Sequence, residues 1–250
     1  MDHLTRIPGP EINGQWSIIS LLTPKQLKVY PYLQPLRNLV NAAFQSNHNG
    51  PVTNYLFPTD RQRLVTDDQL GSELGPSSFT FIISSPVSND GSGGPPRLYA
   101  SASGRPYIPK EAKKDLPKDI EAMHRTKVPI DLDKYEAWEL KILVVDPTLQ
   151  KQGLGSLLMK LVEAEVVKRS AQKRLQASKI ESTGGASDDI VKNGLMEKKV
   201  IMLLDGVKET VDEYYLRRGW VTTEVKPMEN GALGASREWE ACFMQKDVTL

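Results

Sequence analysis

The sequence predicts a mixed α/β fold, and three observations lead to that prediction. Short apolar runs with strand character occur along the whole chain, and longer segments between some of them have apolar residues at helical spacing. Strands and helices do not alternate strictly, because two strand-like runs flank a turn-rich segment and two more end the chain. With 250 residues, 39% of them hydrophobic and 25% charged, the chain has enough apolar residues for a sizeable core.

The apolar runs give the expected strands, and the periodic segments give the expected helices. The strands are expected at residues 16–22, 79–84, 97–108, 138–145, 200–204, 220–226 and 237–248. A first helical segment begins with Thr23 and Pro24 in N-cap and first-turn positions, and Pro31 and Pro35 imply a kink or two shorter pieces. A second helix begins at Gly153 and is expected to end near residue 175; its apolar stripe consists of Leu154, Leu157, Leu158, Leu161 and Val162. A third, short helix ends at Gly219.

We expect a flexible N-terminal tail over residues 1–15 and a single domain over residues 16–250. Residues 109–135 and 176–198 are charged or turn-rich and have no strong periodicity, so we interpret them as insertions in that domain.

Charge and composition exclude several classes of function. The chain has 32 Lys and Arg residues and 31 Asp and Glu residues. The resulting formal net charge of +1 argues against a general nucleic-acid binder. Cys242 is the only cysteine, which excludes an intrachain disulfide and a CxxC metal site. No stretch approaches the about 18 apolar residues of a spanning helix, and no secretory signal pattern is present. We expect a soluble protein in the cytoplasm, with the nucleus also open, and no membrane partner.

The histidines do not suggest a metal or catalytic site. His3, His48 and His124 have no spacing that would bring them together, so we expect them at the surface.

Residues 146–156 (DPTLQKQGLGS) stand between an expected strand and an expected helix. They lack the third glycine of a dinucleotide-binding GxGxxG turn and the GxxxxGK of a P-loop. What remains is QxxGxG, from Gln150, Gly153 and Gly155. Glycines let a backbone approach a ligand closely, and the free amides at a helix N-terminus favour an anion such as a pyrophosphate. Taken alone, the pattern also fits a plain turn between a strand and a helix.

In its context the motif resembles the acetyl-CoA signature of the GNAT superfamily of N-acetyltransferases. In that family a strand ending in LxVxP leads to (Q/R)xxGxG and a helix, and the matching residues here are Leu143, Val145, Pro147, Gln150, Gly153 and Gly155. Residues 213–220 (EYYLRRGW) resemble the family's FYxxxGF; the matching residues are Tyr214, Tyr215, Gly219 and Trp220. The resemblance implies a GNAT-like acyl-CoA N-acyltransferase fold. Such a fold has a mixed, mostly antiparallel twisted sheet with splayed central parallel strands, flanked by helices.

The resemblance also implies where acetyl-CoA, the co-substrate, would bind. Its pantetheine arm would pair with backbone at Leu143, Val144 and Val145. Its pyrophosphate would be held by the loop amides of Gln150, Lys151, Gln152, Gly153, Leu154, Gly155 and Ser156. Two positions depart from the family, because Lys208 and Val211 stand where Asn and Ala are usual, and we expect Lys208 to reach a phosphate instead. No metal takes part in this chemistry.

Acetyl transfer to an amine needs help with two protons. An amine with a pKa of about 10.4 costs roughly 4.6 kcal/mol to deprotonate at pH 7, so a base is useful. Glu139 lies where histone-type relatives of the family place their general base. Glu136 or a water relay could take this role instead. The alternative interpretation is that Glu139 is an exposed strand carboxylate without a catalytic role. Tyr215 matches the family's acid for the leaving thiolate; its alternative is a packed aromatic side chain.

The resemblance therefore predicts an acyltransferase that moves the acetyl group of acetyl-CoA to a primary amine by direct attack within a ternary complex. A small-molecule amine is the first expectation. The alternatives are a lysine or N-terminal amine of a protein or peptide, and a non-catalytic CoA-binding regulatory module. Residues 47–58 and 227–236, which would shape the acceptor site, carry no recognisable code, and a homodimer is left open.

Overall fold

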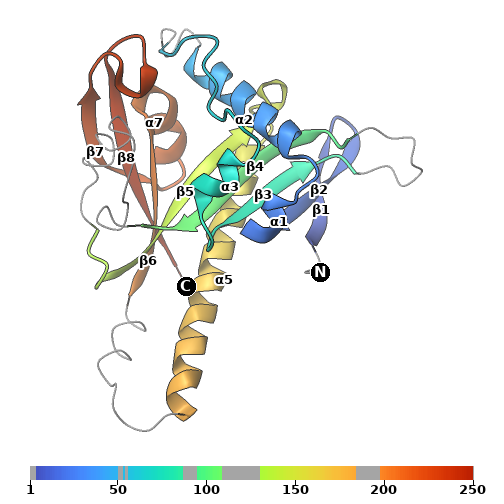
Figure 1. Cartoon of the computed structure of the whole chain (residues 1–250). Helices are drawn as coiled ribbons and strands as arrows, with labels where there is room; N and C mark the ends of the chain where they lie inside the picture. The colour runs from blue at the N-terminus through green and yellow to red at the C-terminus, as the bar shows by residue number, and fades with distance from the viewer. Residues whose placement is uncertain are drawn as a thin grey trace. The chain divides into compact units, whose positions relative to one another are not determined.

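The computed structural model describes residues 4–49, 53, 56–86, 95–108, 130–183 and 198–249. They form a mixed α/β protein (Figure 1) with two compact units, Met1–Arg105 with Leu140–Val162, and Pro106–Glu139 with Glu163–Leu250. Each unit is described by itself below.

The first unit contains an antiparallel sheet in the order β1-β2-β3-β4, with the second half of β5 next to β4. Its strands are β1 (Thr5–Ile12), β2 (Gln15–Leu22), β3 (Phe79–Ser84), β4 (Leu98–Pro106) and β5 (Tyr135–Val145). The expectation of a loose tail over residues 1–15 is wrong, since β1 pairs with β2 through a tight turn at Asn13 and Gly14.

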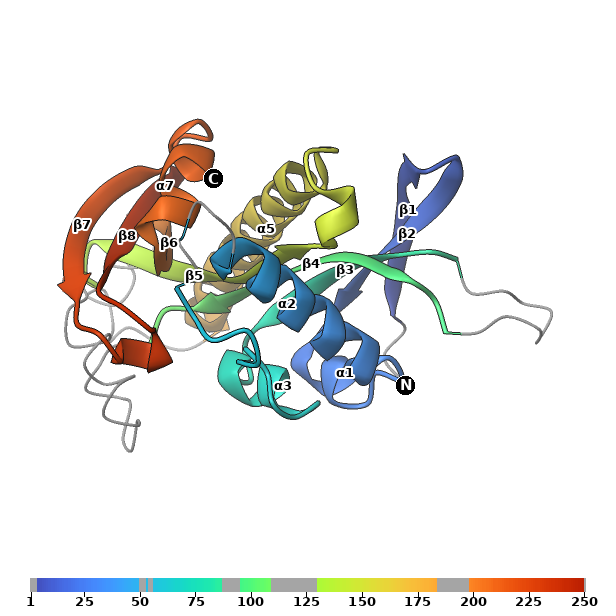
Figure 2. The same ribbon diagram turned by 90° about the horizontal axis from the view of Figure 1, so that it is seen from above.

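Helices cover both faces of this sheet (Figure 2). On one face lie α1 (Pro24–Lys28), α2 (Leu33–His48) and α3 (Gln69–Leu74), and on the other α5 (Leu154–Thr183) begins. The first helical segment is thus two pieces, as its prolines predicted, and Thr23 caps the first piece in a capping box with Gln26. The main core of the unit joins α1, α2 and α3 to the strands; it includes Leu22, Leu36, Val40, Leu70, Ile82 and Leu98.

The second unit holds the one parallel strand pair of the described chain. The first half of β5 runs parallel to β6 (Lys199–Val207), and the register extends from Tyr135↔Lys199 to Glu139↔Leu203. Strand β8 (Trp239–Val248) pairs antiparallel with β6 and with β7 (Val221–Met228), and α7 (Lys208–Leu216) packs on all three. The expected mixed, mostly antiparallel sheet flanked by helices is therefore confirmed.

Two expected boundaries need revision or lie outside the described residues. Helix α5 continues to Thr183, so the insertion expected from residue 176 begins as helix. The remainder of that insertion over residues 184–197, most of the one near 109–135, and His3 and His124 lie outside the described residues. Of the helices in the described ranges, none is long and apolar enough to cross a membrane.

Candidate active site

Strand β5 changes character just before the expected pantetheine-binding residues. Ile142 has a φ of 52°, a conformation that β-branched residues rarely adopt and that occurs at strand bulges. Ile142 and Val144 pack against the core of the first unit, which holds the irregular strand in place. Leu143, Val144 and Val145 follow as partly exposed residues at the end of the strand.

The loop after β5 is fixed at its first residues by side-chain hydrogen bonds. Asp146 caps the short 3₁₀ turn Pro147–Leu149, accepting from the amide (2.9 Å) and the hydroxyl (2.7 Å) of Thr148. Its second carboxylate oxygen accepts from Arg97 at 2.9 Å, and its own amide donates to the carbonyl of Tyr99 at 2.8 Å. The start of β4 thus holds the start of the loop.

The other end of this turn is held from helix α2. Leu149 is almost fully buried, and the side-chain amide of Gln150 donates to Oδ1 of Asn47 at 3.4 Å. Gln150 of the QxxGxG motif therefore has a partner inside the first unit, and its backbone is extended, with φ −62° and ψ 159°.

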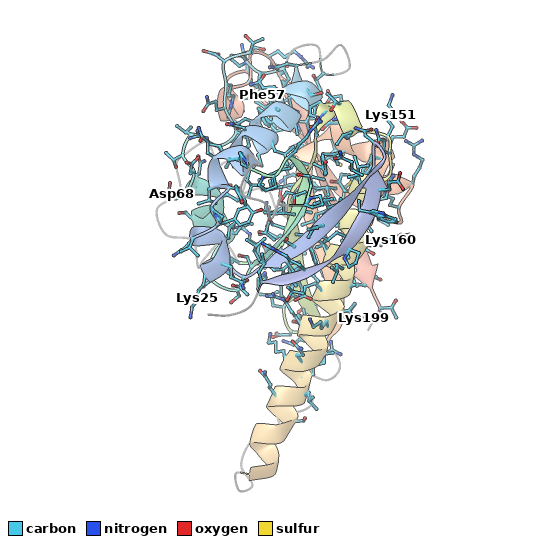
Figure 3. All side chains as sticks on the ribbon, turned by 90° about the vertical axis from the view of Figure 1, so that its right-hand side faces the viewer. Lys25, Phe57, Asp68, Lys151, Lys160 and Lys199 are labelled. Atoms are coloured by element: carbon cyan, nitrogen blue, oxygen red, sulfur yellow. The ribbon has the colours of Figure 1, made fainter. Side chains whose placement is uncertain are left out.

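The loop then continues through exposed residues, from Gln150 to Gly153, before helix α5. Lys151 (φ 65°) and Gly153 (φ 86°) both have left-handed backbone, the alternation that makes anion-binding nests. No atom lies within 4 Å of where a Cβ on Gly153 would stand, so the space beside it is open. Figure 3 places Lys151 on this loop, and Lys151, Gln152 and Gly153 are exposed.

Helix α5 begins directly behind this nest. The amide of Leu157 donates to the carbonyl of Gly153 at 3.0 Å as the first helical bond, which leaves the earlier amides of Leu154, Gly155 and Ser156 at the helix N-terminus. Leu154 and Leu158 are buried and anchor this end of the helix. The first unit thus brings all expected residues from Leu143 to Ser156 into one continuous strand, nest and helix terminus.

Tyr215 lies in the second unit, in the last turn of α7. Its ring makes edge contacts with Tyr214 and Trp220, with centroids at 5.0 and 5.6 Å, and its carbonyl accepts from the amides of Arg218 and Trp220. The helix ends at Leu216, earlier than expected, and Gly219, with φ 80°, lies in the turn that follows it. Burial, with the neighbouring Tyr214, raises the pKa of the Tyr215 phenol, so that it keeps its proton at neutral pH.

The two carboxylates considered as bases differ in environment. Glu139 is 1% exposed, so the alternative of an exposed strand carboxylate is wrong. Glu136, on the same strand, lies 3.9 Å from the ammonium of Lys173 and is mostly buried. Both belong to the second unit, on the half of β5 that pairs with β6.

Lys208 is the first residue of α7, and its ammonium contacts Glu240 on β8 at 2.7 Å. The side chain of Val211, the second departure from the family pattern, fills the space over Gly206, where an added Cβ would lie 2.6 Å from Cγ1 of Val211. Each of the two residues that depart from the family pattern therefore contacts a residue of the second unit: Lys208 contacts Glu240, and Val211 packs over Gly206.

Arg97 and Asn47 are site residues that sequence reasoning missed. They lie 49 and 103 positions from their loop partners, and no local pattern links them. Across the described ranges, no group of three or more His, Cys, Asp or Glu residues could hold a metal ion.

Residues 120–186 match the model of the acetyltransferase (GNAT) family, a range that includes β5, the loop and the whole of α5. This segment of the chain matches the GNAT acetyltransferase family. The match confirms the family expected from the two motifs and the enzyme class expected from it, an acyltransferase. No curated protein matches the sequence.

Three of the solved structures that align with this chain are described by their similarity alone. The ribosomal-protein-S18-alanine N-acetyltransferase of Escherichia coli is 14% identical, with a TM-score of 0.47, over 94% of this chain and 95% of that chain. An aminoglycoside 6′-N-acetyltransferase complexed with coenzyme A is 14% identical, with a TM-score of 0.46, over 93% and 97%. NAA60 of Arabidopsis thaliana, in complex with a bisubstrate analogue, is 12% identical, with a TM-score of 0.47, over 92% and 98%. At this level of similarity none of their substrates transfers to this chain.

Proposed function

We propose that the protein transfers the acetyl group of acetyl-CoA to a primary amine. The observation that carries the proposal is the nest at residues 150–156, where exposed residues with two left-handed backbone conformations lead directly into the N-terminus of a 30-residue helix. Oriented amides and the helix dipole together favour a multiply charged anion such as a pyrophosphate. A turn that only connects a strand to a helix would need neither the open space beside Gly153 nor the hydrogen bonds that join the loop to Arg97 at the start of β4 and to Asn47 in α2.

In this proposal the partly exposed backbone of Leu143, Val144 and Val145 would pair with the pantetheine arm, and the amides of residues 150–156 would hold the pyrophosphate. Lys151 is exposed beside the nest and adds positive charge. Lys208 would have to leave Glu240 to contact a phosphate, so we assign it a smaller part than the loop.

The proposed reaction is direct attack within a ternary complex. The free amine would attack the thioester carbonyl, and the oxyanion of the tetrahedral intermediate would accept a hydrogen bond from backbone near Val145. Collapse would form the amide and expel the thiolate of coenzyme A. Glu139, directly or through water, would take the proton that the amine loses, and Tyr215 would protonate the thiolate. The raised pKa of Tyr215 keeps the phenol protonated at neutral pH but also makes it a weaker acid than an ordinary tyrosine, so its proposed part rests on the match to the family motif.

Replacement of Tyr215 by phenylalanine tests the acid role. Tyr215→Phe removes the hydroxyl and keeps the ring that packs on Trp220, so we expect kcat to fall by about 100-fold or more while acetyl-CoA affinity changes little. Steady-state kinetics and calorimetric binding of acetyl-CoA measure the two effects. Tyr214→Phe, one residue away, is the matched control and should keep most of its activity. Equal rates for parent and Tyr215→Phe would remove Tyr215 from this role.

The acceptor we propose is a small-molecule amine, with a protein or peptide amine as the alternative. Release of coenzyme A thiol, measured with acetyl-CoA and a panel of small amines, lysine peptides and free-N-terminal peptides, decides between them. Binding of acetyl-CoA without turnover on any member of the panel would favour a regulatory CoA-binding module. Absence of acetyl-CoA binding would overturn the proposed function.

A further inference from the structure

A negative charge stands at the start of the loop that we propose for the pyrophosphate. Burial alone would raise the pKa of Asp146, but hydrogen bonds from Thr148 and Arg97 outweigh it and hold that pKa below its usual value. Asp146 is therefore ionised at neutral pH. An uncompensated carboxylate in the loop would repel the anion that the nest is built to bind.

The carboxylate is needed for the shape of the loop. Both bonds from Thr148 to Asp146 close the 3₁₀ turn Pro147–Leu149, and the buried Leu149 follows from that turn. The charge thus comes with the cap that directs the chain toward Gln150 and the nest.

Arg97 is placed to cancel this charge. Its Nη2 donates to Oδ2 of Asp146 at 2.9 Å and to the hydroxyl of Thr148 at 3.2 Å, and its guanidinium lies 5.7 Å from the ring centre of Tyr99. Hydrogen bonds between the backbone of Arg97 and Ser85 fix the base of the side chain. The Asp146 side chain is 17% exposed and that of Arg97 is 54% exposed, so the cation shields the carboxylate from the solvent side.

We propose that Arg97 is a positioning residue for the coenzyme: it fixes and neutralises Asp146, so that loop 146–156 presents a positive end to the pyrophosphate of acetyl-CoA. The inference rests on the proposed function. Exposed ion pairs generally contribute little to stability. The inference gives the Arg97–Asp146 ion pair a role in binding the coenzyme instead. A residue that only braced the loop would act through its hydrogen bonds, whereas the proposed role also requires its charge.

Four variants separate charge from bracing. Arg97→Met leaves Asp146 uncompensated, and we expect the dissociation constant for coenzyme A to rise by about tenfold. Arg97→Lys keeps the charge and should stay close to the parent. Asp146→Asn in the Arg97→Met background removes the repelling charge, and because Asn is also a good cap, affinity should return to within about threefold of the parent. Arg37→Met, which removes the Arg37–Asp67 ion pair on α2 of the same unit, is the matched control and should bind like the parent.

Calorimetric titration with coenzyme A, with melting temperatures to confirm folding, measures the series. A double variant that binds as weakly as Arg97→Met would overturn the charge role, and so would unchanged binding by Arg97→Met. A parent that does not bind coenzyme A would overturn the proposed function and this inference with it. Recovery in the double variant, with Arg97→Lys near the parent, supports the inference.

Discussion

His48 is a titratable side chain that the fold keeps neutral. It lies in the last turn of α2, with ring centroids 4.5 Å from Phe44 and 5.5 Å from Phe57, rather than on the open surface where it was expected. In the described part of the chain its Nδ1 is buried without a hydrogen-bond partner. Burial, helped by the charge of Arg61, lowers its pKa to about 4. Protonation of His48 therefore opposes folding.

This environment predicts an acid-side loss of stability. Because the pKa is near 6.5 when unfolded and about 4 when folded, the unfolded state takes up the proton first, and the free energy of unfolding falls as the pH drops from 6.5 to 4. The loss amounts to about 3 kcal/mol, from 1.36 kcal/mol per pKa unit. His48→Leu should lack this loss, as measured by urea unfolding at pH 7 and pH 4.5. Phe44→Leu, which disturbs the same cluster without titrating, should keep it, and equal slopes in all three proteins would contradict the assignment.

Residue-level prediction succeeded where the signal was local and failed where the partner was distant. A glycine within a few positions of a helix end predicts a left-handed backbone conformation, and Gly153 and Gly219 both adopt that conformation. Arg97 and Asn47 reach the loop only through tertiary folding, so neither stands out in the sequence. The burial of His48 likewise depends on packing against Phe57, which lies outside α2.

Among the elements, the N-terminal hairpin was missed although its turn has a strong signal. Asn13 and Gly14 have φ values of 51° and 78°, the positive pair that a type I′ hairpin turn requires. The run before this turn contains Pro8 and Pro10, and proline is uncommon inside strands. Because β1 is an edge strand with an irregular register between Pro8 and Glu11, the prolines are tolerated there. The other predicted strands have no proline among their central, buried residues, and the structure confirms these strands.

The packing of α7 on β6 gives a prediction at the element scale. A Cβ on Gly206 would lie 2.6 Å from Cγ1 of Val211, so Gly206→Ala should destabilise the protein by about 1–3 kcal/mol through overpacking. Val211→Ala makes room, and the double variant should be more stable than the sum of the single changes predicts. A double-mutant cycle by chemical denaturation measures this coupling.

The control for this cycle is a glycine with ordinary contacts. At Gly71 in α3 the nearest atom to an added Cβ is Cγ of Lys28 at 3.9 Å, so Gly71→Ala should be neutral or gain about 0.5–1 kcal/mol from helix propensity. Additive effects of Gly206→Ala and Val211→Ala would contradict close packing of α7 on β6.

At the scale of the whole molecule, the chain passes between its two compact units only inside regular structure. The three passages fall between Arg105 and Pro106 in β4, between Glu139 and Leu140 in β5, and between Val162 and Glu163 in α5. Domain boundaries normally lie in exposed linkers, where few bonds are lost on separation. We therefore propose that the two units act as a single domain, as expected from the sequence for residues 16–250 but with β1 included, and that the protein unfolds in one cooperative step.

Tryptophan placement makes this proposal testable. Trp16 is 68% exposed and lies in the first unit, whereas the other three tryptophans, Trp138, Trp220 and Trp239, lie in the second. In a Trp16→Phe background, fluorescence therefore reports the second unit alone, and far-ultraviolet circular dichroism reports both. Leu36→Ala, in the core of the first unit, should cost about 2–5 kcal/mol.

If the chain unfolds as one cooperative unit, Leu36→Ala lowers the denaturation midpoint seen by the second unit's tryptophans as much as the midpoint seen by circular dichroism. The midpoint measured by fluorescence must shift because, in a cooperative domain, a loss of core packing in the first unit also lowers the stability of the second unit. Val29→Ala, at a residue that is 80% exposed in the first unit, should move neither signal. A fluorescence midpoint that stays in place while the circular dichroism transition splits in two would show that the units unfold independently despite the strands and helix that run through both.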